Sequence, residues 1–169
     1  AGSCVLSLNG KGPRITMATF GKVIDWGITD VNNMGAAMAP SAMQTLLTHF
    51  ENTKTTPDDY DLIATGDLGK LGSEILIDLM EDKGIKLGLN YGDCGQMYFR
   101  RDQNTLCGGS GCGCSATVFT SYIMKKLQDG QYKRVLFMPT GALLSTTATQ
   151  QGESVPGVCH AIVIESEEG

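Results

Sequence analysis

The sequence predicts an α/β domain with a mixed, mostly parallel sheet flanked by helices. Short runs rich in β-branched and apolar residues alternate with runs of helical period, as they do in strand–helix–strand units. The 169 residues suit one core, and no internal repeat or linker divides them. With 41% hydrophobic and 18% charged residues, the chain has a globular composition. We therefore expect residues 1–169 to form a single domain.

A pair of strands is expected first. Residues 3–8 (SCVLSL) and 14–26 (RITMATFGKVIDW) are rich in apolar and β-branched side chains, and the turn NGKGP separates them. Residues 27–38 are interpreted as an ordered loop. A helix from Pro40 to Glu51 should follow, because proline suits a first helical turn and the apolar side chains fall on one face. Those side chains are Met43, Leu46, Leu47 and Phe50.

The middle of the chain alternates in the same way. Residues 56–59 combine a capping hydroxyl, a proline and two acids, which predicts a short helical turn. Residues 61–65 (DLIAT) form the next expected strand, and it ends at Gly66. Ser73 should cap a helix that runs to Lys83 and stops at Gly84. Its inward side chains would be Ile75, Leu76, Leu79 and Met80.

The last third should contain a helix and two closing strands. Residues 91–109 are irregular, with one extended piece. The helix is expected over about 113–129, and it ends at the pair Asp129-Gly130. Residues 134–140 (RVLFMPT) and 158–166 (VCHAIVIES) have the composition of strands.

The stretch before the last helix raises several alternatives, because three cysteines and four glycines occupy residues 107–114. Metal binding is disfavoured, since the C-x4-C-x-C spacing matches neither zinc pairs nor the common iron–sulfur runs. Cys159 and His160, as neighbours in a strand, would point to opposite faces. A nucleotide site is weak, because the stretch lacks the P-loop lysine and the last glycine of a dinucleotide motif. A carboxylate or thioester oxygen near the loop amides stays plausible.

A nucleophile is a further alternative, because Cys112 or Cys114 at a helix start could have a lowered pKa. However, His49 is expected at the edge of a surface helix and His160 in a terminal strand, with a site role open only for His160. The structural interpretation is that glycine permits close backbone approach and that cysteine packs as a small hydrophobe. The following helix is apolar on nearly every side until Lys125, which predicts burial on all faces.

Charge and hydropathy exclude several classes of protein. The net charge is −5 and the basic residues are scattered without a basic stripe, so nucleic acid is not an expected partner. No apolar run approaches the roughly 20 residues of a membrane-spanning helix, and the first residues lack the charged start of a signal peptide. The six cysteines are expected to be reduced, as in a cytoplasmic protein.

Five segments together carry a resemblance to a known family. They are GKVIDWGITDVNNMGAAMAPSAMQTLLTHF, TPDDYDLIATGDLGKLGSEILIDLM, YGDCG, GGSGCGCSATVFTSYIMKKLQDGQYKRVLFMPTGALLS and QQGESVPGVCHAIVIE. They resemble the C-terminal half of the stage V sporulation protein AD family, which has a thiolase-like fold similar to ketoacyl-synthase III. In that fold two α/β halves pack as an α-β-α-β-α sandwich with one buried central helix from each half. The resemblance implies that residues 1–169 are one half-domain, and that residues 1–8 look like the last strand of the other half.

The resemblance also bears on catalysis. In condensing enzymes the nucleophilic cysteine lies on the central helix of the first half, and the second half supplies a histidine and an asparagine or histidine. The positions of these partners here correspond to Asp67 and Ser110, so no catalytic residue is assigned. An acyltransferase or condensing enzyme of the thiolase superfamily remains an alternative, as does a scaffold with a vestigial pocket.

The function that the resemblance implies is non-catalytic. It is the binding and uptake of dipicolinic acid, as calcium dipicolinate, during sporulation, and its release at germination. Membrane proteins of the same operon would be partners of a cytoplasmic-type soluble protein at the spore inner membrane. The expected ligand-binding residues are Asp67, Gly109, Ser110 and Gly111, with Ca²⁺ bridging the ligand to Asp67 and no metal site of the chain's own.

An interface is expected on the last helix. In the two-half fold, the face of residues 115–124 meets the central helix of the N-terminal half, so in this chain alone it would be exposed. A second copy is expected to replace that half in a twofold homodimer. The predicted interface residues are Val118, Phe119, Tyr122 and Ile123.

Overall fold

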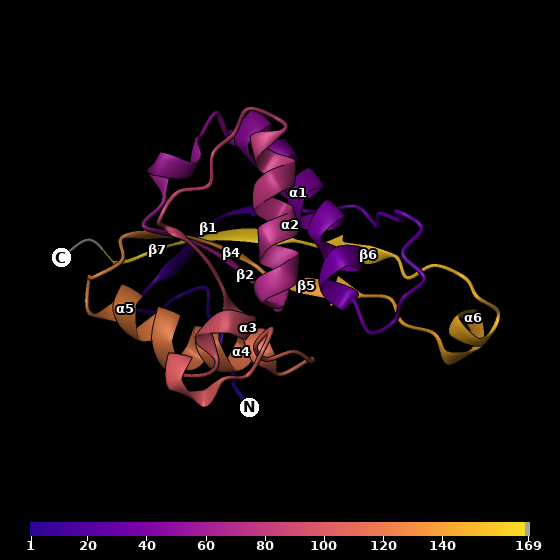
Figure 1. The fold of residues 1–169 in the computed structure, drawn as a ribbon. Helices are drawn as coiled ribbons and strands as arrows, with labels where there is room; N and C mark the ends of the chain where they lie inside the picture. Colours follow the sequence, from indigo (N-terminus) through magenta and orange to yellow (C-terminus); the bar gives the residue numbers. More distant parts are fainter. Residues whose placement is uncertain (168–169) are drawn as a thin grey trace.

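The chain forms an α/β domain whose central sheet has helices on both faces (Figure 1). This computed structural model describes residues 1–167 except the side chain of Arg101. The main sheet has the strand order β1-β7-β4-β2-β3, and β5 pairs with β6 in a second, two-stranded sheet. The prediction of an α/β fold with a mixed sheet between helices is confirmed. The strands are β1 (Arg14–Thr19), β2 (Leu62–Thr65), β3 (Tyr91–Asp93), β4 (Arg134–Met138), β5 (Thr140–Ala142), β6 (Gly157–Cys159) and β7 (Ala161–Glu165).

Two long helices cover one face of the main sheet, and a series of short helices covers the other (Figure 1). The long ones are α1 (Met34–Thr53) and α2 (Gly69–Glu81). The short ones are α3 (Cys94–Met97), α4 (Cys114–Val118), the π-helical turn η3 (Phe119–Ile123) and α5 (Met124–Gln128). The 3₁₀ turns η1 (Pro57–Asp59) and η2 (Arg101–Gln103) and the helix α6 (Thr146–Gln150) lie in the connections. Within residues 1–167, none of the helices has both the length and the apolar character that crossing a bilayer requires.

The sheet is less parallel than predicted. β2 pairs in parallel with β3 and with β4, but β7 runs antiparallel to both β4 and β1. The connection from β4 to β7 turns back through the β5–β6 pair, so it does not make the helical crossover that a parallel neighbour needs.

Separate hydrophobic clusters fill the two faces of the sheet. Met38, Leu46 and Leu76 belong to the cluster beneath α1 and α2, while Phe119 and Phe137 belong to the cluster on the other face, where their rings stack at 4.6 Å. β2 and β4 are buried along nearly their whole length, because both of their faces are covered.

Several boundaries differ from the predictions, and the strand expected over residues 14–26 ends already at Thr19. Residues 3–8 form no strand, and Val5 and Leu8 are 94% and 102% exposed, because this chain offers no strand beside them. α1 begins at Met34, inside the expected loop, with the Asn33 side chain accepting a hydrogen bond from the Ala36 amide at 3.2 Å. α2 begins at Gly69, one turn before the expected Ser73.

The expectation that the last helix is buried on all faces is wrong. Val118, Phe119 and Ile123 are buried in the chain's own core, against the sheet, so they are not exposed in the absence of another half. On the outward side Ser121 is exposed and Tyr122 is 43% exposed. Of the predicted interface residues, only Tyr122 is accessible.

His49 is also placed differently from the prediction, since it is fully buried on the inner side of α1. Its Nδ1 lies 2.8 Å from Thr19 Oγ1, and its Nε2 lies 2.7 Å from the Tyr60 hydroxyl. The Tyr60 hydroxyl in turn lies 3.1 Å from Thr55 Oγ1. The ring therefore joins α1 to β1 and to the segment before β2 through a chain of hydroxyl groups. Burial, with a smaller contribution from the Arg134 charge, lowers the pKa of His49 from its ordinary value of 6.5.

This lowered pKa predicts a loss of stability in mild acid. Near and below the ordinary pKa of 6.5 the unfolded chain binds a proton that the folded chain resists, so the free energy of unfolding falls as the pH falls through this value toward the lowered pKa of the folded state. The extra slope is at most about 1.4 kcal/mol per pH unit. Urea unfolding at several pH values should show it in the wild type and in His160→Gln, an exposed control, but not in His49→Gln. Equal slopes in the two variants would contradict this role for His49.

Candidate functional site

The candidate site lies where the parallel strands β2, β3 and β4 end. The carboxyl ends of parallel strands are the usual place for ligands in open α/β sheets. Asp67 follows β2, Asp93 is the last residue of β3, and Thr140 begins β5 directly after β4. The glycine-rich residues 107–113 lie over this edge.

Asp93 holds the edge together, and sequence analysis did not identify it. Its side chain is only 1% exposed, and its two oxygens accept five hydrogen bonds. Burial raises the pKa of Asp93, while the hydroxyl and amide donors act in the opposite direction. Four of the donors are backbone amides near the starts of α2 and α3, which have no partner within their own helices. The donors are Thr65 Oγ1 at 2.7 Å, Leu68 N at 3.0 Å, Gly69 N at 2.9 Å, Gly95 N at 2.9 Å and Gln96 N at 3.3 Å.

Asp67 binds the glycine-rich loop to the sheet. Its Oδ2 accepts hydrogen bonds from the Ser110 hydroxyl at 3.0 Å and from the Gly111 amide at 2.8 Å. Its Oδ1 accepts one from the Thr140 hydroxyl at 3.1 Å. The structure thus brings together Asp67, Ser110 and Gly111, as predicted. However, the expected free amides are absent at two positions, because Gly111 donates to Asp67 and Gly109 donates to the Gly95 carbonyl at 2.8 Å.

Glycine is required where this loop meets α3. A Cβ on Gly108 would lie 2.5 Å from the Gly95 carbonyl oxygen, and Gly108 has a φ of +104°. A Cβ on Gly95 would lie 2.4 Å from the Gly109 carbonyl oxygen. The interpretation that the glycines permit close backbone approach therefore agrees with the structure. The loop and α3 pack backbone against backbone.

The same groups line a cavity of about 310 Å³, which we call the Asp67 pocket. It lies between the start of α1, the start of α2 and the glycine-rich loop, and Asp67 is the charged side chain that lines it. Three of the four predicted ligand-binding residues, namely Asp67, Gly109 and Ser110, lie on its wall. Gly111 does not line it. The remaining lining residues are Asn32, Asn33, Met34, Gly35, Leu68, Gly69, Leu71, Cys107 and Gly108.

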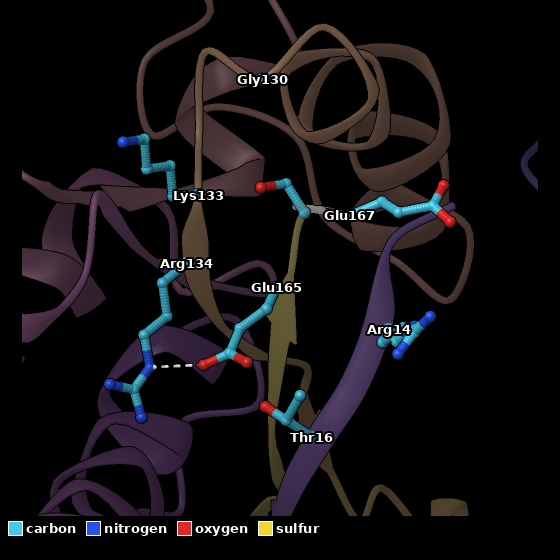
Figure 2. Close-up of a pocket in the computed structure, with 8 residues that line it drawn as sticks. Arg14, Thr16, Gly130, Lys133, Arg134, Glu165 and Glu167 are labelled. Atoms are coloured by element: carbon cyan, nitrogen blue, oxygen red, sulfur yellow. Dashed lines mark ion pairs between the residues drawn. The ribbon is translucent and has the colours of Figure 1, made fainter. Parts of the chain in front are cut away.

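A larger cavity of about 920 Å³ lies at the opposite end of the sheet (Figure 2). Arg134 there pairs with Glu165, with 3.2 Å between Nε and Oε1. Arg14 and Lys133 extend toward opposite sides of the cavity (Figure 2). Its charges are therefore paired or divergent, whereas a ligand site needs a few convergent polar groups.

The thiols and imidazoles do not form a nucleophile–base pair at the Asp67 pocket. Cys114 is buried, and burial raises the pKa of its thiol to about 11, which excludes the alternative of a lowered pKa at this position and agrees with a packing role. Cys107 and Cys112 are exposed, which contradicts a packing role for these two. His160 Nδ1 accepts a hydrogen bond from the Gly21 amide at 3.0 Å, and neither His49 nor His160 lines the pocket. Within residues 1–167, no three side chains of His, Cys, Asp or Glu gather as metal ligands.

Replacing Asp93 tests its role as an acceptor of several hydrogen bonds. In Asp93→Asn, an amide NH₂ would face buried N–H donors in either orientation of the side chain. We expect the free energy of unfolding to fall by roughly 1–3 kcal/mol for each donor left unpaired, as measured by urea unfolding. The matched control Asp78→Asn alters an exposed carboxylate on α2 and should stay within about 0.5 kcal/mol of the wild type. A stable Asp93→Asn would show that the five hydrogen bonds contribute little.

Comparisons with known proteins identify the family of the chain. The family described as stage V sporulation protein AD (SpoVAD) matches residues 1–165. The chain is 46% identical, over all of its 169 residues, to stage V sporulation protein AD of Bacillus subtilis (strain 168). That alignment covers 50% of the relative, so the chain spans about half the length of the curated relative that it matches. We conclude that this chain belongs to the stage V sporulation protein AD family of sporulation proteins.

Proposed function

We propose that this chain is a non-catalytic half-domain of thiolase-like fold that binds dipicolinic acid, as calcium dipicolinate. In this role it takes part in the uptake of the ligand during sporulation and in its release at germination, at the inner membrane of the spore and beside membrane proteins. Membership of a sporulation family supports the biological setting. The observation that carries the proposal is the Asp67 pocket at the carboxyl ends of the parallel strands.

The charge at this pocket explains why calcium belongs to the proposal. Dipicolinate is a dianion, and Asp67 would repel it in the absence of a cation. Asp67 Oδ1 accepts one hydrogen bond from Thr140, so it keeps a lone pair that can face a cation. Calcium takes six to eight oxygen ligands. Most of them would come from the ligand's carboxylates and from water, with Asp67 as the protein's contribution.

Three features favour binding over catalysis. Asp67, which the resemblance places where condensing enzymes hold a histidine, has its carboxylate occupied by Ser110, Gly111 and Thr140. The Cys114 thiol is held protonated by burial. The side chain of His49 lies in the core of the protein, where it is hydrogen-bonded to Thr19 and Tyr60. A condensing reaction receives no support from this geometry.

Calorimetric titration tests the proposal directly. Dipicolinate should bind to the chain more tightly with calcium than without it. Asp67→Asn should weaken the calcium-dependent binding by about tenfold or more, since a charged contact contributes roughly 1.5–3 kcal/mol. Asp58→Asn removes an exposed carboxylate that does not line the pocket and serves as the control.

The outcomes separate the proposal from its alternatives. Calcium-dependent binding that needs Asp67 supports the proposal. Binding that is unchanged in Asp67→Asn would remove this residue from the site and reduce it to a loop anchor, whose loss costs about 1 kcal/mol of stability. No binding at any calcium concentration would favour the scaffold with a vestigial pocket.

We also propose that a second copy of the chain covers the outward face of α4 and η3. The N-terminal segment lies on this face, because Gly2 packs against Ala116 and Thr120. Val5 and Leu8 in the segment are almost fully exposed, and Tyr122 is 43% exposed. Exposed apolar side chains of this size are common at protein interfaces. The relative is twice as long as the chain, so in the longer protein a further part of similar size is available to take the place of the second copy.

Light scattering at micromolar to millimolar concentration should therefore show a dimer. Tyr122→Glu should shift it toward the monomer, because it places a charge in the covered face. Leu89→Glu, at a residue 108% exposed in the loop before β3, is the matched control and should leave the dimer unchanged. Phe119→Glu is unsuitable, since Phe119 stacks on Phe137 inside the core. A wild-type chain that stays monomeric throughout would contradict the proposal.

A further inference from the structure

The turn before β1 contains the one Asn-Gly pair of the sequence, Asn9-Gly10. Both residues are exposed and lie outside the helices and strands. A Cβ on Gly10 would meet only the Ser7 Cβ, at an ordinary contact distance of 3.9 Å. The φ of Gly10 also lies outside the left-handed region, so the conformation of the turn does not require glycine at this position.

Asn-Gly pairs are chemically labile for a reason of geometry. The backbone nitrogen of the glycine attacks Cγ of the asparagine, a five-membered succinimide ring closes, and the side-chain nitrogen leaves as ammonia. Water then opens the ring at either carbonyl, which leaves aspartate or isoaspartate. Glycine favours this reaction, because it has no Cβ to hinder the attack and its backbone rotates freely.

Neither reacting group is held by the fold. Within residues 1–167, the Asn9 side chain and the Gly10 amide have no hydrogen-bond partner. The Asn9 amide donates to Ser7 Oγ at 3.3 Å, and the Ser7 hydroxyl donates to the Asn9 carbonyl at 3.2 Å. Both bonds are exposed to water, and exposed bonds of this kind open at little cost. The Gly10 nitrogen can therefore reach the Asn9 Cγ while the domain stays folded.

The segment is anchored on both sides of the pair, but not at the pair itself. Gly2 packs against Ala116 on α4, and the Gly12 amide donates to Glu167 Oε2 at 2.9 Å. Between these two anchors, every residue from 3 to 11 is exposed. Segments with few buried contacts have the lowest opening free energies of a protein. The pair should therefore react in the folded chain nearly as it does in a free peptide.

Comparable positions elsewhere in the chain are protected. The one Asp-Gly pair, Asp129-Gly130, closes the end of α5, where the Gly130 amide donates to the Leu127 carbonyl at 3.2 Å. The Asn90 side chain donates to the carbonyls of Pro57 and Tyr60, both at 2.8 Å. A nitrogen that donates in this way, or an amide held on two sides, is not free to close a ring. Asn9 differs from these residues in its environment as well as in its sequence.

We propose that Asn9-Gly10 is a site of spontaneous deamidation in the folded protein. The bond between the Gly10 nitrogen and the Asn9 Cγ forms as the bond from Cγ to the side-chain nitrogen breaks, and the Gly10 proton leaves with the ammonia. Water is the co-reactant that opens the ring. The product adds one negative charge to a chain whose net charge is −5. Where the product is isoaspartate, the backbone is also longer by one carbon.

The consequence for association rests on the proposed function, namely on the second copy that covers the outward face of α4 and η3. Leu8, which is 102% exposed and directly precedes the pair, belongs to the segment on that face. A new carboxylate beside Leu8 would lose water when the face is covered, so the modified chain should associate more weakly. The reaction does not reverse. The fraction of modified chains would therefore increase with the age of the protein.

Peptide mass spectrometry after incubation at mildly alkaline pH tests the site. The peptide that carries Asn9 should show the exchange of NH₂ for OH, and an isoaspartyl methyltransferase should label part of the product. The peptides that carry Asn90 and Asn104 should stay unchanged over the same time. The rate should rise with pH, because the attacking amide must lose its proton. A synthetic peptide of residues 5–14 gives the unrestrained rate, which the folded chain should match within about threefold.

Two glycine variants make the result specific. Gly10→Ala should slow the reaction about tenfold or more, because a Cβ hinders the attack, and the space around residue 10 accepts a methyl group. Gly113→Ala is the matched control, since a Cβ there also meets nothing within 4 Å, and it should leave the rate at Asn9 unchanged. Melting temperatures check that both variants are folded.

The outcomes separate the site from its consequence. An Asn9 peptide that stays unmodified, or that reacts far more slowly in the folded chain than in the synthetic peptide, overturns the proposed site. Light scattering of Asn9→Asp tests the consequence, and a smaller dimer fraction than in the wild type supports it. Deamidation in a chain that is monomeric in every form retains the site and overturns the proposed second copy. An unchanged dimer in Asn9→Asp retains both and overturns the effect of the charge.

Discussion

The buried carboxylate of Asp93 is the interaction on which the ligand-binding edge depends. It stands at the end of β3 and accepts hydrogen bonds from β2, from the start of α2 and from the start of α3. These donors cannot reach water, because Asp93 is 1% exposed. An unpaired buried donor costs more than an ordinary hydrogen bond contributes, so the position strongly requires an acceptor with two oxygens. One side chain thereby sets where two helices begin relative to two strands.

The glycine-rich loop is positioned from this point outward. Asp93 accepts a hydrogen bond from the Gly95 amide, and the Gly95 carbonyl accepts one from the Gly109 amide. Asp67 then holds the next part of the loop through Ser110 and Gly111. These contacts lead from the buried carboxylate of Asp93 to the half-buried carboxylate of Asp67 and from there to the wall of the Asp67 pocket. The loop therefore has a defined shape although it contains neither helix nor strand between residues 104 and 113.

The features that could be predicted from the sequence are those set by residues close to one another along the chain. The buried strand at residues 62–65 and the helix over residues 114–128 follow from local composition and period. The start of α2 at Gly69 was missed, because its capping carboxylate comes from Asp93 on another strand. The burial of His49 was missed for the same reason, since Thr19 and Tyr60 reach it from outside α1. Residues 3–8 have strand composition, but a strand also needs a partner, and composition does not supply one.

In the candidate site, too, contacts between distant parts of the chain decide what the sequence could not predict. Asp67, Ser110 and Gly111 were predicted from the resemblance, and they are in contact. The occupation of the Gly109 and Gly111 amides could not be predicted, because it depends on how α3 and β2 approach the loop. Asp93 itself has a local signal, an aspartate followed by Cys94-Gly95 at a strand end, which is the pattern of a helix N-cap.

The residues Cys107 and Gly108 line the Asp67 pocket and also line a neighbouring cavity of about 440 Å³. Any side chain larger than hydrogen at residue 108 would collide with the Gly95 carbonyl, so residue 108 cannot carry a side chain without displacing α3. A change there would alter both cavities at once. Divergence in ligand preference among related proteins should therefore accumulate at side chains that belong to one cavity alone, such as Asn32 for the Asp67 pocket and Asn104 for its neighbour.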